Sequence, residues 1–195
     1  MVTIFLAKTP SKITGEIYCK ARLNEIASCT NEKVKKQKFY AWALLEKCAI
    51  SLGYELDKLH FFKLDIGKWK CDKFEFSLSH SDDFVAVAIS DIPVGIDLQK
   101  DTNINCDTLA KRILTVGENL EYIELGEDKK QRYLLEKWTQ KESIYKMLEL
   151  NDLKISKINC SNYPINTIEL ILDGDTYYLS YAPFEKDTCV NLIKI

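Results

Sequence analysis

The chain has 195 residues, of which 46% are hydrophobic and 29% are charged, and its formal net charge at pH 7 is −2. A chain of this length and composition can bury a sizeable core as one domain or as two small ones. A net charge so close to zero gives no general attraction to nucleic acid or to an anionic membrane, so we expect neither as a partner. The seven cysteines are odd in number and form no C-x-x-C pair, which argues against a zinc site and a full disulfide framework.

The first ten residues, MVTIFLAKTP, contain no basic region followed by a long apolar run. A signal peptide needs that combination, and a membrane-spanning helix needs about 20 mostly apolar residues. We therefore expect a reduced, cytoplasmic protein with no membrane segment.

The first half of the chain has the pattern of a strand, two helices and three further strands. We expect strands at 2–7, 59–65, 74–80 and 84–90, and helices at 18–28 and 35–52. A lysine-rich turn, NEKVKKQK, precedes the longer helix. Residues 90–93 have turn chemistry. The strand that follows, at 94–99, is therefore predicted to pair antiparallel with the strand at 84–90.

The same order of elements then recurs. The strand at 94–99 leads to helical segments near 106–113 and 117–124 and a long helix near 128–149, and then to strands at 167–173, 176–182 and 189–195. This repetition predicts an α+β fold made of two similar halves, residues 1–92 and 93–195, each with a long helix against an antiparallel sheet. With only four prolines and seven glycines, the chain has no obvious linker, so the halves should pack as one unit.

The stretch VGIDLQ places polar groups on one face of an otherwise apolar strand. Gly95, Asp97 and Gln99 alternate with apolar residues, which is the period-two pattern of a half-buried strand. Asp97 and Gln99 therefore share a face, and their oxygens can converge on one ion. Because an isolated acid on a strand is more often a turn or strand-end residue, Asp97 by itself does not decide between the two interpretations.

The long helix of the second half carries charged residues within its apolar face. At 100° per residue, Glu142 falls between Leu135 and Trp138, and Lys141 also falls within the apolar arc. Lys146 follows Glu142 by one turn, on the edge of the same face. A carboxylate in a core-facing stripe must be paired, hydrogen-bonded or bound to a metal. Two interpretations of Glu142 stay open: a structural ion pair with Lys146, and a carboxylate with a functional role.

A third polar group, Ser79-His80-Ser81, ends the strand expected at 74–80. Two hydroxyls and an imidazolium at a turn suit a phosphate, whereas the alternative is a surface turn with an incidental histidine. A serine hydrolase is disfavoured, because adjacent strand residues point to opposite faces and the chain has no G-x-S-x-G elbow.

These three segments resemble the motifs of the 4′-phosphopantetheinyl transferase superfamily and, within it, those of the pseudodimeric, Sfp-like class. The segments are SLSHS, then VGIDLQK after one intervening strand, then KWTQKESIYKM. The family patterns are S-H-S, (V/I)-G-(I/V)-D-x-E and (W/F)-(S/T/C)-x-K-E-(S/A)-x-x-K, and the third is matched throughout. The resemblance extends from about Asp57 to Lys146 and more loosely to both ends. It implies two similar α+β halves packed as a pseudo-twofold dimer, with the active site between them.

The resemblance also implies roles for individual residues. Asp97, Gln99 and Glu142 would bind Mg²⁺, with the pyrophosphate of coenzyme A as co-ligand. Contacts to coenzyme A are implied for Lys33, Lys36, Lys68, Ser79, His80 and Lys141. Glu142 is also a candidate for the base that takes the serine proton, and Lys146 would steady the phosphates. A lysine-rich turn such as the one at the start of the first long helix is otherwise a solvated face.

Three features depart from the family patterns. Gln99 stands where G-I-D-x-E has a second acid, so a neutral amide would reach the metal directly or through water. The first long helix lacks the arginine that family members commonly place after the basic turn, which weakens the case for tight binding of the 3′-phosphate. Lys68 lies in GKWK, where the family often has G-K-P.

The implied function is that of a monomeric, Mg²⁺-dependent transferase. It would move phosphopantetheine from coenzyme A to a serine of an apo acyl or peptidyl carrier protein and release adenosine 3′,5′-bisphosphate. Two alternatives stay open: a Mg²⁺-dependent phosphohydrolase that uses the same carboxylates, and a degenerate coenzyme A- or carrier-binding protein in which Gln99 marks lost turnover. The motifs do not name the carrier, because they do not describe docking surfaces.

Overall fold

The structure is a computed structural model that describes residues 1–65, 67–185 and 187–193. The chain divides into two compact units, Met1–Pro93 together with Lys186–Ile195, and Val94–Glu185. Each unit is a mixture of helices and mainly antiparallel strands, which confirms the predicted α+β class. The pseudo-twofold arrangement stays a prediction.

The first unit is built on a four-stranded sheet with the order β4-β5-β1-β9. Its strands are β1 (Thr3–Lys8), β4 (Glu75–Ser81), β5 (Phe84–Ser90) and β9 (Cys189–Leu192). β5 pairs antiparallel with both β1 and β4, so both of its edges are occupied. The predicted antiparallel pair of 84–90 with 94–99 is therefore wrong, because β5 has no edge left for the following strand.

Strand β9 belongs to the first unit although it is the last element of the chain. It runs parallel to β1, with Cys189 opposite Thr3 and Leu192 opposite Leu6. The strand predicted at 189–195 is present over the bounds of β9, but its partner is β1 and not the sheet of the second unit. Residues 194 and 195 of that prediction lie outside the described residues. An alternating pattern identifies a strand without naming its partner.

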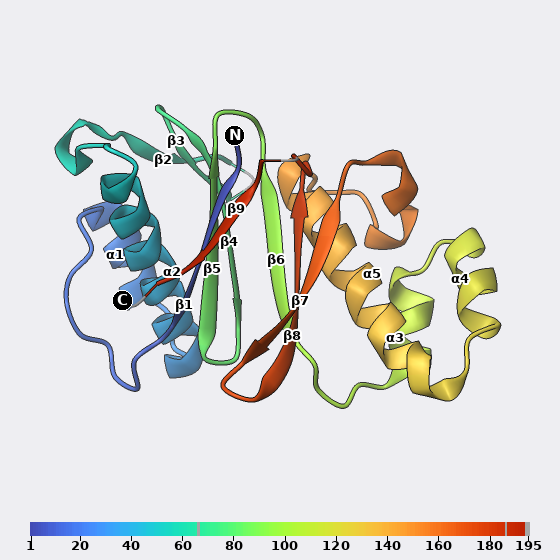
Figure 1. Cartoon of the computed structure of the whole chain (residues 1–195). Coiled ribbons are helices and arrows are strands. Elements are labelled where there is room, and N and C mark those ends of the chain that lie inside the picture. Colours follow the sequence, from blue (N-terminus) through green and yellow to red (C-terminus); the bar gives the residue numbers. More distant parts are fainter. Residues whose placement is uncertain (66, 186, 194–195) are drawn as a thin grey trace. The chain divides into compact units, whose positions relative to one another are not determined.

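The shorter of two helices packs on the longer one, which covers one face of this sheet (Figure 1). They are α1 (Lys20–Ala27) and α2 (Glu32–Ser51). The side chain of Asn31 caps α2 by accepting a hydrogen bond from the backbone N–H of Val34 at 3.0 Å. Trp42, Leu44 and Leu45 of α2 are fully buried. A 3₁₀ turn, η1 (Leu56–Lys58), leads to a hairpin of β2 (Phe61–Lys63) and β3 (Trp69–Cys71).

The second unit has a three-stranded antiparallel sheet with the order β6-β8-β7. The strands are β6 (Gly95–Lys100), β7 (Asn166–Leu172) and β8 (Asp175–Ala182). The helices are α3 (Cys106–Ile113), α4 (Val116–Ile123) and α5 (Glu127–Met147), and two 3₁₀ turns follow, η2 (Ile155–Lys157) and η3 (Cys160–Asn162). Helix α5 packs along the sheet (Figure 1).

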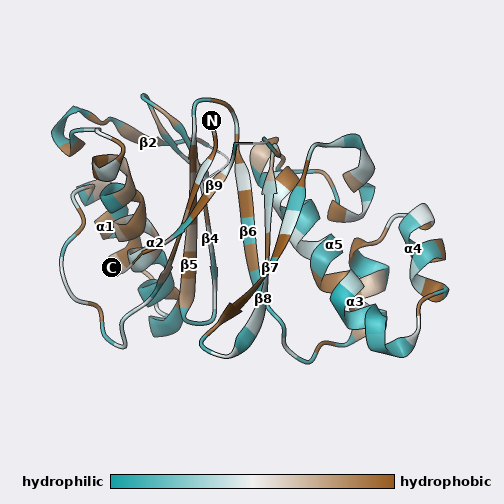
Figure 2. Ribbon diagram, in the orientation of Figure 1, coloured by the Kyte–Doolittle hydropathy of each residue, from teal (hydrophilic) through white to brown (hydrophobic). Residues whose placement is uncertain are grey.

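The hydropathy of the elements matches their burial. Strand β5 is buried at every residue and hydrophobic, whereas α5 is hydrophilic over most of its length (Figure 2). In the part of the chain that the structure describes, no helix combines the length and the apolar composition that crossing a lipid bilayer requires.

Gly95 sets how closely α5 approaches β6. A Cβ at this position would lie 1.8 Å from the carbonyl oxygen of Ser143 and 2.7 Å from the backbone nitrogen of Met147. Only a residue without a Cβ fits so close to another backbone. The glycine beside the strand acid therefore makes room for α5, and α5 carries the charged residues of the third motif.

Candidate active site

Asp97 on β6 and Lys146 on α5 form an ion pair. The Nζ atom of Lys146 lies 2.7 Å from Oδ1 of Asp97 and also donates a hydrogen bond to the carbonyl oxygen of Ile96 at 2.9 Å. Asp97 is only 7% exposed. Lys146 therefore pairs with Asp97, and its charge also lowers the pKa of Glu142.

Glu142 lies one helical turn before Lys146 and is half-buried. Within residues 94–185, no group donates a hydrogen bond to its carboxylate. Burial raises the pKa of Glu142 and the charge of Asp97 raises it further, whereas Lys146 and Arg112 lower it. Two carboxylates close enough for one to raise the pKa of the other form a place where a cation is favoured.

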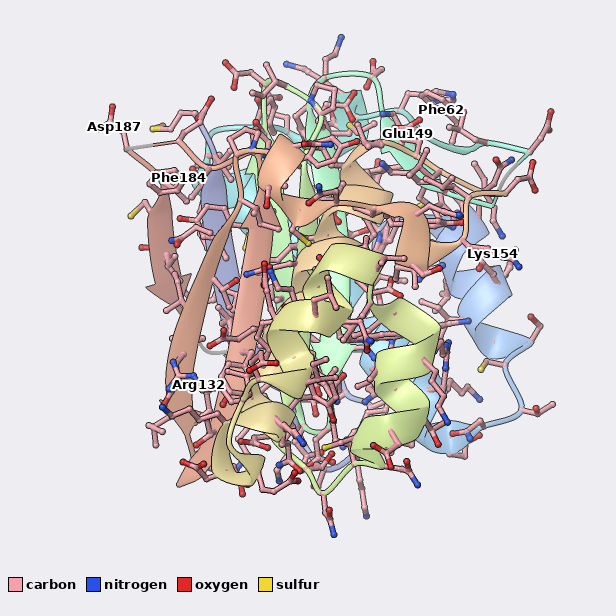
Figure 3. All side chains as sticks on the ribbon, turned by 90° about the vertical axis from the view of Figure 1, so that its right-hand side faces the viewer. Phe62, Arg132, Glu149, Lys154, Phe184 and Asp187 are labelled. Atoms are coloured by element: carbon pink, nitrogen blue, oxygen red, sulfur yellow. The ribbon has the colours of Figure 1, made fainter. Side chains whose placement is uncertain are left out.

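Glu142 lines a pocket with a volume of about 480 Å³. The lining residues are Arg112, Trp138, Glu142, Tyr145, Leu153, Lys154, Ile155 and Ser156. They come from α3, α5 and the segment after α5, from which the exposed Lys154 extends (Figure 3). The guanidinium of Arg112 lies 5.0 Å from the centre of the Trp138 ring, within the range of a cation–π interaction. The pocket thus combines one carboxylate, two cations and an aromatic wall.

The donor atoms of Asp97 and Glu142 fit Mg²⁺. This ion is usually bound through one or two carboxylates, with water and phosphate oxygens in its other positions. A divalent cation would also relieve the repulsion that raises the pKa of Glu142. Across the described ranges 1–65, 67–185 and 187–193, no three His, Cys, Asp or Glu side chains are arranged as a metal site.

Gln99 follows Asp97 by two residues on β6 and is partly buried. Its side-chain nitrogen donates to the backbone carbonyl of Lys100 at 3.4 Å, which is long for a hydrogen bond. The side chain is therefore weakly held. The metal-ligand role of Gln99 stays a prediction.

Lys141 is fully buried and is not part of the pocket wall. Its Nζ atom lies 2.7 Å from Oε2 of Glu118 and 2.5 Å from the carbonyl oxygen of Ile158. Glu118 also completes a capping box with Thr115 at the start of α4. Burial alone would raise the pKa of Glu118, but hydrogen bonds from Lys141 and Thr115 hold it below its ordinary value. This placement favours a structural role for Lys141, and its contact to coenzyme A stays a prediction.

In the first unit, basic groups gather at the turn between β4 and β5. Lys33 contacts Asp82 at 2.8 Å and Lys36 contacts Asp83 at 3.1 Å, from Nζ to Oδ1 in both pairs. These aspartates directly follow the motif Ser79-His80-Ser81. The fold therefore brings the start of α2 next to the turn that follows Ser79-His80-Ser81. The phosphate-binding role of these residues stays a prediction. Within the motif the two serines are buried, whereas the histidine is exposed on the other strand face.

Lys68 lies on a different element of the first unit, in the turn of the β2–β3 hairpin. This turn is closed by a hydrogen bond from the backbone N–H of Leu64 to the carbonyl oxygen of Lys68 at 2.8 Å. The predicted contact of Lys68 to a phosphate stays a prediction.

Arg112 and Lys154 line the pocket although no sequence motif indicates them. Both are basic residues without a motif, and they reach the pocket only because α3 and the segment after α5 fold onto α5. Trp138 and Tyr145 of α5 are only partly buried and form part of the pocket wall.

The comparisons of this chain with known proteins all point to the same family. A family model described as the 4′-phosphopantetheinyl transferase superfamily matches residues 93–191, just over half of the chain. The 4′-phosphopantetheinyl transferase Sfp of Bacillus subtilis (strain 168) is 31% identical over 109 residues, which cover 53% of this chain and 48% of the relative. The 4′-phosphopantetheinyl transferase gsp of Aneurinibacillus migulanus is 26% identical over 163 residues, which cover 76% and 66%.

A third relative, the 4′-phosphopantetheinyl transferase psf-1 of Bacillus pumilus, is 32% identical over 74 residues, which cover 38% of this chain and 31% of the relative. The chain thus spans between about a third and two thirds of the length of these relatives. The range matched by the family model includes Asp97, Glu142 and Lys146.

Proposed function

This chain belongs to the 4′-phosphopantetheinyl transferase superfamily, and from that membership we propose that it transfers 4′-phosphopantetheine from coenzyme A to a serine of an acyl or peptidyl carrier protein. The observation that carries the proposal is the group formed by Asp97, Glu142 and Lys146 beside a pocket. In that group, residues of two separate sequence motifs meet through the packing of α5 on β6.

We assign the nucleotide end of coenzyme A to the first unit. Lys33 and Lys36 would bind the 3′-phosphate, the exposed His80 would donate a hydrogen bond to a phosphate oxygen, and Lys68 would add a further positive charge. The ion pairs of the two lysines with Asp82 and Asp83 do not oppose this assignment. Each involves an exposed or half-exposed partner and contributes about 1 kcal/mol or less. A phosphate can compete for such lysines.

Asp97 and Glu142 would hold Mg²⁺, which when bound supplies positive charge against the pyrophosphate. Lys146 keeps the Asp97 carboxylate in place through their ion pair. The Lys146 ammonium would also stabilise negative charge on a transferred phosphate near these carboxylates.

In the proposed reaction the serine oxygen of the carrier forms a bond to the phosphorus nearest the pantetheine. The bond from that phosphorus to the bridging oxygen breaks, and adenosine 3′,5′-bisphosphate leaves with the electron pair. Glu142 takes the serine proton. Its position supports this role, because it borders a pocket and no residue of 94–185 donates a hydrogen bond to its carboxylate. Most of the rate enhancement would come from positioning and charge stabilisation.

The direct test is to incubate the protein with coenzyme A, Mg²⁺ and a panel of apo carriers from fatty-acid, polyketide and nonribosomal-peptide systems. Intact mass measurement should show one carrier serine gaining phosphopantetheine, and a metal chelator should stop the gain. Release of phosphate from coenzyme A without any carrier would instead support a phosphohydrolase. Binding of coenzyme A without turnover on any carrier would support a binding protein.

A further inference from the structure

A polar network in the first unit, outside the groups assigned above, has Glu25 of α1 at its centre. Oε2 of Glu25 accepts a hydrogen bond from Nε1 of Trp69 at 2.7 Å. Its Oε1 lies 3.0 Å from Nη1 of Arg22 and 3.3 Å from Nζ of Lys63. Lys63 and Trp69 are opposite each other in the β2–β3 register, and Lys68 lies in the turn between them. One carboxylate therefore holds both strands at the point where they enter that turn.

Arg22 connects this carboxylate to the core. Its side chain is almost fully buried, and its guanidinium lies 5.2 Å from the ring centre of Trp42 and 5.9 Å from that of Trp69. Trp42 is fully buried in α2 and donates a hydrogen bond from Nε1 to Oε1 of Glu46 at 2.8 Å. A cation stacked on two indoles and paired with a carboxylate resists displacement. The hairpin is thereby attached to the rigid part of the unit.

The hairpin depends on its attachments to the rest of the unit, of which this network is one and the packing of Phe61 and Trp69 on Trp42 is another. Its strands have three residues each, and a two-stranded hairpin of this size is marginally stable alone. Burial would raise the pKa of Glu25, but the hydrogen bond from Trp69 and the charge of Arg22 hold it below its ordinary value. The carboxylate is therefore ionised at neutral pH and keeps both charged partners.

We propose that Glu25 is a positioning residue for coenzyme A, which fixes the β2–β3 hairpin so that Lys68 meets a phosphate of the substrate. The proposal rests on the proposed function for the identity of that substrate. Trp69 directly follows Lys68, so the hydrogen bond that its indole N–H donates to Glu25 restrains the backbone beside Lys68.

The test is the variant Glu25→Gln, with the Kd for coenzyme A as the first readout because it requires neither carrier nor turnover. The amide can still accept the Trp69 hydrogen bond but loses its charge toward Arg22 and Lys63. We expect the Kd and the KM for coenzyme A to rise on the order of tenfold, with kcat and the KM for the carrier nearly unchanged. The matched control is Glu55→Gln, which removes the same charge from an exposed pair with Lys58 and should change none of these constants.

A double-mutant cycle shows whether the effect passes through Lys68. In a Lys68→Ala background, Glu25→Gln should add little to the Kd, because the positioned group is already absent. An unchanged Kd in Glu25→Gln, or full additivity of the two substitutions, would overturn the proposal. Wild-type protein that binds coenzyme A but modifies no carrier would contradict the proposed function while leaving this test intact. Wild-type protein that does not bind coenzyme A would contradict both.

If circular dichroism shows that Glu25→Gln does not fold, Trp69→Phe provides the second variant. It keeps an aromatic ring beside Arg22 but deletes the indole N–H that bonds Glu25. The same selective rise in the Kd for coenzyme A is expected, and a folded Trp69→Phe protein with wild-type affinity would overturn the proposal.

Discussion

Glu142 is the residue on which the proposed chemistry depends most, because it borders the pocket and is close enough to Asp97 for that charge to raise its pKa. The variant Glu142→Gln nearly preserves the size of the side chain but can neither accept a proton at neutral pH nor bind a cation as tightly. We expect kcat for carrier modification to fall by about 10²–10⁴-fold with little change in the melting temperature.

The control for this variant is Glu136→Gln on the same helix, which breaks an ion pair with Arg132 at 2.8 Å. Since Arg132 is largely exposed, we expect near wild-type activity from the control. An active but less stable Glu142→Gln protein would return Glu142 to a structural role.

A second prediction about a single residue concerns Gln99. An amide in place of a carboxylate removes one negative charge from the proposed ligand set, and hard cations bind carboxylates more tightly. Gln99→Glu should therefore lower the Mg²⁺ concentration that half-saturates activity, because residue 99 shares a strand face with Asp97. Titrating activity against Mg²⁺ for both proteins measures the shift. If the Mg²⁺ titration curve is the same for both proteins, residue 99 does not bind the ion, and Asp97 and Glu142 remain as the proposed protein ligands.

At the scale of elements, the contact between β6 and α5 depends on a single missing side chain. Gly95→Ala would place a methyl group 1.8 Å from the Ser143 carbonyl oxygen, so one of the two elements must move. We expect the free energy of unfolding to fall by about 1–3 kcal/mol or more, and activity to fall with it. Chemical denaturation measures the first effect.

Gly117→Ala on α4 is the matched control, because a Cβ at that position meets no atom within 4 Å. Alanine is the better helix former by about 1 kcal/mol, so this variant should be neutral or slightly stabilised. Equal destabilisation of the two variants would show that the close approach is not what makes Gly95 necessary.

The buried pair of Lys141 and Glu118 connects α5 to the start of α4, and it gives a prediction that depends on pH. Glu118→Gln would leave a buried ammonium without its counter-charge, which should cost about 3–5 kcal/mol of unfolding free energy at pH 7. The pKa of Glu118 is lowered in the folded state. Its contribution is therefore complete above the ordinary glutamate pKa of about 4.3 and is lost as the pH falls below it.

Wild type and Glu118→Gln should consequently converge in stability as denaturation is repeated at lower pH. A difference that stays constant from neutral pH to pH 3 would mean that the ionised form of Glu118 contributes nothing to folding.

At the scale of the whole molecule, the chain enters the second unit once and then returns to the first unit through β9. A chain shortened to end at Glu185 would leave β1 as an unpaired edge of its sheet. We expect faster amide hydrogen exchange in β1 and more aggregation, since exposed edges pair with other chains. Exchange in β7 and β8 should be unchanged. Equal loss of protection in both sheets would show that β9 supports more than its own sheet.

The sequence by itself determined the elements and the motifs, because both are local. The spacing of apolar residues located the helices and most strands, and the third motif identified Glu142 and Lys146 on one helix face. Motif order was enough to identify the family. The β2–β3 hairpin was the part of the fold that the sequence predicted least well. Each of its strands has only three residues, which is too short for an alternating pattern to be recognised.

Only the tertiary structure decided which groups are partners. Periodicity shows the face on which a side chain lies, but the atom it meets depends on the backbone that packs against that face. Lys146 therefore pairs with Asp97 across a contact that Gly95 permits, and β9 pairs with β1 from the far end of the chain. For the same reason, no pattern in the sequence could show that Arg112 lines the same pocket as Glu142, or that Glu25 contacts both strands of the hairpin that carries Lys68.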